Sequence, residues 1–138
     1  MAQRGLLKDG VYTMAEIKNW LIANPQQAQS LMHENPRYIF FKKTDRPGAV
    51  GSLGVPLTAG RSLAVDPAYV PLGSFLWLQT TAPDGSALNR LVTAQDTGSA
   101  IKGAVRGDFF WGTGDKALKE AGRMKSRGVY FLLLPKSK

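Results

Sequence analysis

The spacing of apolar residues predicts two short helices at the start of the chain. Thr13 and Glu16 stand three residues apart, in the pattern of a capping box, and apolar residues then recur at helical spacing as far as Pro25. The pattern predicts one amphipathic helix before Pro25 and a second after it. Asn24 is the expected cap of the second helix, and Asn35-Pro36 is expected to end it.

After these helices, short apolar runs separated by turn residues replace the helical period. Five runs have the composition of strands: Arg37 to Lys42, Ser62 to Val65, Ser74 to Thr80, Arg90 to Gln95 and Gly128 to Leu134. A loop rich in glycine and proline is expected between Thr44 and Gly54, and one short helix from about Asp115 to Ala121, ended by Gly122. The chain is therefore expected to be mainly β (α+β), with the strands forming a small barrel or sandwich.

Composition excludes several kinds of site. The 138 residues suit one globular domain, and they include no cysteine and a single histidine, His33. Disulfides and thiolate metal sites are therefore excluded, and one imidazole with scattered acids does not suggest a zinc or iron centre. We expect no metal and no cofactor. No apolar run has the length of a signal peptide or a membrane span.

The chain is basic, with a net charge of +8. From Lys102 onward nine basic residues stand against three acids. Such a surface favours a polyanionic partner, and nucleic acid, anionic lipid headgroups and the carboxylates of peptidoglycan all qualify. A solvated basic face that has no partner explains the charge equally well.

Asp96 ends a predicted strand and leads into Thr97-Gly98. Loops at strand ends often carry active-site groups, but an Asp before such a turn also bonds the backbone routinely. From the residues alone the turn role is favoured, because a lone Asp-Thr-Gly triplet is a weak motif.

Asp108 stands between Gly107 and the aromatic run Phe109-Phe110-Trp111. Apolar rings beside a carboxyl group disfavour its anion and prepare it to donate a proton, and aromatic faces can stack on sugar rings. Alternatively, the phenylalanines fill the core and Asp108 caps the next turn. The sequence leaves both interpretations open.

Asp66 precedes Pro67, a pair that favours turn initiation, so a structural role is its default. Nucleophilic serine chemistry is not expected, because the only histidine lies on a predicted N-terminal helix.

Six blocks of the sequence, in order, resemble the C-terminal half of MltA-type lytic transglycosylases. They are Thr13 to Leu21, Asn35 to Lys42, Gly54 to Asp66, Val70 to Gly73, Ala94 to Gly103 and Arg106 to Gly114. The resemblance implies that the part from Gly54 is the three-aspartate domain of that family, a six-stranded double-psi β-barrel. It implies a division into residues 1–53, holding the helices, first strand and loop, and residues 54–138, holding the barrel.

In that family the β-1,4 bond between N-acetylmuramic acid and N-acetylglucosamine is cleaved, and the muramyl 6-hydroxyl closes a 1,6-anhydro ring. The attacking hydroxyl belongs to the substrate, so one carboxyl group can serve first as acid and then as base.

The resemblance also implies roles for particular residues. Asp108 and Asp96 are the expected catalytic residues: Asp108 falls on the acid/base and Asp96 on the family's second aspartate, while Asp66 falls on the third. An ionised Asp96 near Asp108 would favour the protonated form of Asp108 and stabilise positive charge on the sugar. The positions expected to bind substrate are Asp66, Thr97, Gly98, Lys102, Phe109 and Trp111.

The expected partner is the glycan strand of peptidoglycan rather than nucleic acid. The expected location is the periplasmic face of the outer membrane of a Gram-negative bacterium, with a membrane link only through a lipid anchor outside this sequence. In the family a second domain and N-terminal strands encoded earlier complete the groove, so the sequence predicts a fragment or a reduced homologue. A non-catalytic glycan-binding barrel and a nucleic-acid-binding domain are the alternatives.

Overall fold

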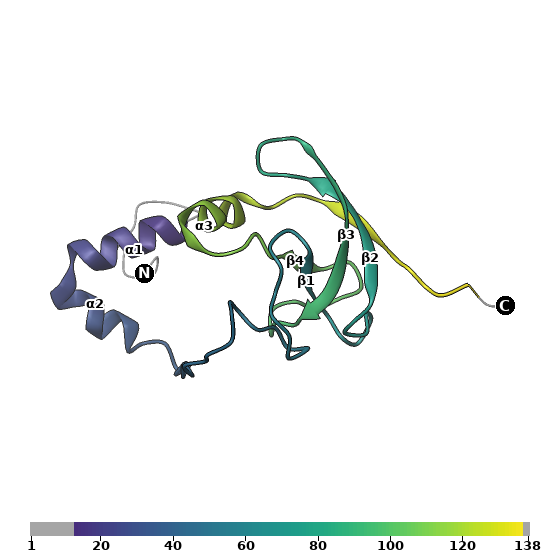
Figure 1. The fold of residues 1–138 in the computed structure, drawn as a ribbon. Helices are drawn as coiled ribbons and strands as arrows, with labels where there is room; N and C mark the ends of the chain where they lie inside the picture. The colour runs from purple at the N-terminus through teal and green to yellow at the C-terminus, as the bar shows by residue number, and fades with distance from the viewer. Residues whose placement is uncertain (1–12, 137–138) are drawn as a thin grey trace. The chain divides into compact units, whose positions relative to one another are not determined.

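The computed structural model describes residues 13–136 and divides the chain into two compact units, Met1–Thr44 and Asp45–Lys138 (Figure 1). The first unit holds α1 (Met14–Ala23) and α2 (Pro25–Met32). The second holds a sheet and one further helix, with the elements β1 (Ser62–Val65), β2 (Phe75–Thr81), β3 (Ala87–Asp96), β4 (Gly107–Phe109), α3 (Gly114–Arg123) and β5 (Gly128–Leu132). In the described residues the fold is mainly β, with five strands and three helices.

The capping box of α1 is confirmed. The Glu16 N–H donates to Thr13 Oγ1 at 3.3 Å, and the Thr13 N–H donates to the Glu16 carboxylate at 2.7 Å. This second bond, and then the hydroxyl of Thr13, lower the pKa of Glu16. Pro25 takes the first turn of α2 as predicted, but the Asn24 side chain does not cap that helix. Its amide donates to the Trp20 carbonyl at 2.9 Å, so the side chain ends α1 instead.

The strand predicted at Arg37 to Lys42 is wrong. These residues form no strand, and their aromatic side chains are exposed, Phe41 by 94%. A strand needs a partner for its backbone groups. The described part of this unit contains only helices besides this segment, so no partner is available there.

The second unit is built on one five-stranded sheet with the order β4-β1-β3-β2-β5. The short strand β1 runs parallel to β3 and antiparallel to β4, and the long strand β2 lies antiparallel between β3 and β5. Figure 1 shows β2 and β3 as a long curved hairpin with β1 and β4 beside it. The four strands predicted in this unit are confirmed, β1 at its predicted bounds, whereas β4 was not predicted.

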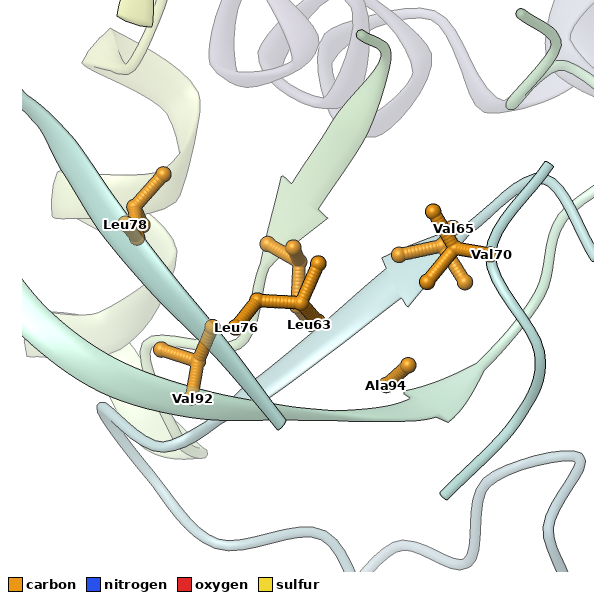
Figure 2. Packing of buried hydrophobic residues seen from close by; sticks show 7 residues of the cluster. All are labelled: Leu63, Val65, Val70, Leu76, Leu78, Val92 and Ala94. Atoms are coloured by element: carbon orange, nitrogen blue, oxygen red, sulfur yellow. The ribbon is translucent and has the colours of Figure 1, made fainter. Parts of the chain in front are cut away.

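Alternate residues of the strands fill one core. Leu63, Leu76, Val92 and Ala94 are at most 1% exposed, and they form one cluster with Val65. Figure 2 shows these side chains brought together from β1, β2 and β3. The period-2 burial of β2 follows from the alternation of side chains along a strand. The core therefore fixes the register of the strands that carry the site.

The helix α3 runs through the glycine that was predicted to end it. It reaches Arg123, and the Met124 N–H donates to the carbonyls of Glu120 and Ala121. Gly122 therefore occupies a helical position, and the prediction of its role as a terminator is wrong.

We predict that Leu76→Ala destabilises the chain strongly, because Leu76 is fully buried between three strands. The expected loss is about 2–5 kcal/mol of unfolding free energy, measured by urea denaturation. Leu118→Ala is the matched control, since Leu118 on α3 is 63% exposed, and it should change stability by less than about 0.5 kcal/mol. Equal effects of the two variants would contradict the assignment of the core.

Candidate active site at one end of the sheet

The topology brings the three predicted aspartates to one end of the sheet. Asp66 follows the last residue of β1, and Asp96 is the last residue of β3. Because β1 and β3 are parallel, their carboxyl ends lie at the same end of the sheet. The antiparallel strand β4 starts at that end, and it carries Asp108.

Asp66 is a buried carboxylate that holds two backbone segments. It is 5% exposed, and its oxygens accept the Gly103 N–H at 2.9 Å and the Ala68 N–H at 3.2 Å. These two bonds, helped by Lys102 at 3.9 Å, outweigh the effect of burial and lower the pKa of Asp66. Asp66 therefore joins the end of β1 to the loop between β3 and β4. This agrees with the structural role that its position before a proline predicts.

A residue of β5 makes a second contact that holds the loop between β3 and β4. The Tyr130 hydroxyl donates to the carbonyl of Ala104. Burial, and to a lesser extent the nearby charge of Asp66, raises the pKa of Tyr130, so the phenol stays a donor at neutral pH. The loop that leads into Asp108 is thus fixed from two strands.

Asp96 is held by a loop that lies far away in the sequence. One of its oxygens accepts both the backbone N–H and the hydroxyl of Ser52, each at 2.9 Å. The Ser52 hydroxyl also lies 2.7 Å from the hydroxyl of Thr97. The loop that carries Ser52 can lie this close to the end of β3 because residue 51 is glycine. A Cβ at Gly51 would lie 2.3 Å from the carbonyl oxygen of Gln95.

Asp108 is the most open of the three carboxylates. Its side chain is 57% exposed, and one oxygen lies 3.3 Å from Arg106 Nε. An ion pair that is exposed on both sides holds its partners weakly. Asp108 is a strand residue, so the hypothesis that it caps a turn is wrong, and it remains open to a ligand.

The aromatic neighbours of Asp108 line a cleft with it. The rings of Phe109 and Trp111 meet edge to face, with centroids 5.0 Å apart. Both rings, Asp108 and Tyr130 line a hollow of about 600 Å³, large enough for a sugar-sized ligand. Asp66, Asp96, Thr97, Gly98 and Lys102 are not among its lining residues.

The register sets how far the second aspartate lies from Asp108. Ala64 on β1 is opposite Asp96 on one side and opposite Asp108 on the other. Two strand spacings put their Cα atoms about 10 Å apart. Asp96 and Asp108 therefore flank the same residue of β1 from its two neighbouring strands.

The site contains residues that the sequence did not reveal. Ser52 lies in a loop 44 positions before its partner, and no periodic pattern connects them. Arg106 could have been found, because positions two apart in an extended segment lie on one face. Arg106 was not predicted, because the sequence analysis did not recognise β4 as a strand.

In residues 13–136, no group of three or more possible ligands is placed to hold a metal ion. None of the helices in that range combines the length and the apolar character needed to cross a bilayer.

Comparisons with known proteins match both parts of the chain. Residues 61–134 match the 3D domain family, and residues 1–42 match the MltA specific insert domain. Membrane-bound lytic murein transglycosylase A of Vibrio cholerae is 31% identical over 93% of the chain, and the match spans 36% of that relative.

Solved structures agree with these matches. MltA from Neisseria gonorrhoeae is 48% identical, with a TM-score of 0.89 over 98% of the chain and 35% of that structure. Escherichia coli MltA with bound chitohexaose is 28% identical, with a TM-score of 0.83 over 96% of the chain and 42% of that structure.

The 3D domain match covers more than half of the chain and falls on the curled sheet, so the chain belongs to this family. The insert-domain match, the relatives and the solved structures make the chain similar to lytic transglycosylases of the MltA type. The chain spans little more than a third of the length of the relatives it matches.

We predict that Asp66→Asn lowers the melting temperature at neutral pH, because an amide cannot accept both N–H bonds equally well. The folded-state pKa of Asp66 lies below its ordinary value of 3.8. Its stabilising effect is therefore complete above about pH 4 and is lost as the pH falls through the lowered folded-state value. Thermal unfolding of both proteins from neutral to strongly acidic pH should show the gap between them closing in acid. A gap that stays constant would contradict this role.

Proposed function

We propose that this chain is the catalytic barrel part of a lytic transglycosylase that cleaves the β-1,4 bond between N-acetylmuramic acid and N-acetylglucosamine in peptidoglycan. The observation that carries the proposal is Asp108, an open carboxylate in an aromatic-lined cleft beside two further aspartates. The names of the relatives support it, and so does the chitohexaose bound to the Escherichia coli structure.

Asp108 performs both proton transfers in the proposed reaction. It donates a proton to the glycosidic oxygen as the bond to the anomeric carbon of the muramyl residue breaks. It then takes the proton of the muramyl 6-hydroxyl, whose oxygen bonds to the same carbon and closes the 1,6-anhydro ring. The proton returns to Asp108 and no water is consumed. Its exposure suits this role, because the carboxyl group must reach two oxygens of the substrate.

Asp96 supplies negative charge to the same end of the sheet. Its two bonds from Ser52 hold the carboxylate in place, with its Cα about 10 Å from that of Asp108. It also stabilises positive charge that develops on the sugar. Asp96 is thus a positioning and electrostatic residue, and Asp108 is the catalytic one.

The other predicted site residues divide into two groups. Phe109 and Trp111 line the cleft and offer apolar faces to sugar rings. The remaining positions, which are Asp66, Thr97, Gly98 and Lys102, form and hold the neighbouring loop. We propose that these residues take part in substrate binding by shaping that loop. We also propose that the basic surface attracts the carboxylates of the peptide stems.

We propose that the five strands are the larger part of the six-stranded double-psi barrel. In residues 13–136, β4 and β5 are the outer strands of the sheet order, and each leaves one edge available for pairing. The division into residues 1–53 and 54–138 is likewise a proposal, supported by family matches that end at residue 42 and resume at residue 61.

We propose a location on the periplasmic face of the outer membrane of a Gram-negative bacterium, with any membrane link through a lipid anchor. The proposal is supported by relatives whose names describe them as membrane-bound.

We predict that Asp108→Asn abolishes turnover, with a rate at least about 100-fold lower, because the amide has the same shape but cannot carry the proton. The measurement is release of soluble muropeptides from purified murein sacculi at high enzyme concentration. Asp115→Asn is the matched control, because Asp115 is an exposed carboxylate on α3 that does not line the cleft. Unchanged release by the Asp108 variant would sink the assignment.

We predict that Asp96→Asn slows the reaction less, by about tenfold, and displaces the acidic limb of the rate profile against pH. The variant perturbs the charge near the acid but leaves the acid in place. The measurement is the rate of muropeptide release at a series of pH values. A profile that keeps its shape and position would count against the coupling of the two aspartates.

The same assay separates the alternatives. Binding to sacculi without any soluble product would leave a non-catalytic glycan-binding barrel. Tight binding to oligonucleotides that falls steeply with salt would favour a nucleic-acid-binding domain.

A further inference from the structure

Tyr130 on β5 lines the Asp108 cleft, although β5 and β4 stand at opposite ends of the sheet order. β5 pairs with β2, where Tyr130 is opposite Leu78. The ring of Tyr130 packs against the core cluster, which fixes its direction. The two outer strands share one cleft because the sheet curls, so a contact between Tyr130 and the chain leading into β4 bears on the shape of the site.

The Tyr130 hydroxyl makes that contact. It donates to the carbonyl of Ala104, three residues before β4 begins. The preceding residue, Gly103, is held separately, since its N–H donates to the Asp66 carboxylate at 2.9 Å. Two successive residues of the loop are therefore fixed, one through its N–H from the end of β1 and the other through its carbonyl from β5.

The backbone turns sharply between these two bonds and Asp108. Gly103 has a φ of +101°, which glycine adopts without strain, and the Arg106 N–H donates to the Gly103 carbonyl at 3.4 Å. Arg106 and Val105, which is 81% exposed, line the cleft before β4 begins. A displacement of the loop at Ala104 is therefore carried directly into the strand that holds Asp108.

Asp108 depends on its backbone for its position, because its side chain has only an exposed ion pair. β4 is an outer strand of three residues and pairs with β1 on one side. Beyond Asp108, the Phe110 N–H donates to the Ser62 carbonyl at 3.0 Å. The anchors on the two sides of Asp108 thus determine where its carboxyl group lies.

We propose that Tyr130 is a positioning residue for the transglycosylase reaction: its hydroxyl holds the loop at Ala104 and so sets the place from which Asp108 reaches the glycosidic oxygen. The role rests on the function proposed above. Tyr130 transfers no proton in it, since its hydroxyl hydrogen is held by the Ala104 carbonyl. The ring forms part of the cleft wall, and the hydroxyl anchors the loop.

The first test separates the hydroxyl from the ring. Tyr130→Phe keeps the ring in the cleft wall, so we expect the KM for soluble murein fragments to stay within about twofold, while kcat falls about fivefold to tenfold. Tyr69→Phe is the matched control, because Tyr69 is 60% exposed and does not line the cleft. It should leave both constants unchanged.

The second test needs no activity and measures amide hydrogen exchange in the whole chain. In Tyr130→Phe the Gly103 amide should exchange about tenfold faster, because its bond to Asp66 then holds the loop alone. The Phe110 amide, on the other side of Asp108, should keep its rate. Tyr69→Phe should change neither amide.

Other outcomes overturn the proposal in distinguishable ways. A raised KM with an unchanged kcat would show that the Tyr130 hydroxyl contacts substrate instead of positioning Asp108. Unchanged exchange at Gly103 would show that the hydroxyl does not hold the loop, and equal acceleration at Gly103 and Phe110 would show a general loss of stability. If the unaltered chain releases no muropeptides, the proposed function fails, while the exchange of Gly103 still decides whether Tyr130 holds the loop.

Discussion

The site depends on one short strand that is paired on both sides. β1 has only four residues, all buried, yet it bonds to β3 in parallel and to β4 in antiparallel orientation. This pairing puts the last residue of β3 and the first residues of β4 at the same end of the sheet. Without β1, Asp96 and Asp108 would belong to strands that have no contact in the sheet order.

The core and the loops keep this arrangement in register. Leu63 and Val65 anchor β1 in the cluster shared with β2 and β3. Buried Asp66 then fixes the loop that leads into β4, and Ser52 fixes the end of β3. The two supporting contacts are hydrogen bonds to carboxylates, whereas Asp108 has only an exposed ion pair. Asp66 and Asp96 are thus held in place while Asp108 stays exposed, which suits the acid role proposed for it.

The sequence predicted the fold where local signals are strong. Thr13 and Glu16 mark the first helix, and the apolar run of β1 was predicted at its observed bounds. The segment from Arg37 to Lys42 shows the limit of composition, because its strand-like residues have no partner strand in their described unit. β4 was missed for the opposite reason, since three residues cannot show a period and Gly107 is a poor strand former.

The candidate site was only partly predictable. The order of the blocks identified the three aspartates, but their environments depend on contacts between distant residues. Ser52 meets Asp96, and Gly103 meets Asp66, through folding that no local pattern encodes.

The most direct test of the central claim is the fate of water in the reaction. Purified sacculi are digested by this chain in water labelled with heavy oxygen, and the muropeptides are analysed by mass spectrometry. If Asp108 takes the proton of the muramyl hydroxyl, the products are 1,6-anhydro sugars that contain no labelled oxygen. Products carrying one labelled oxygen at the cleaved end would show attack by water and would contradict the single-carboxylate account.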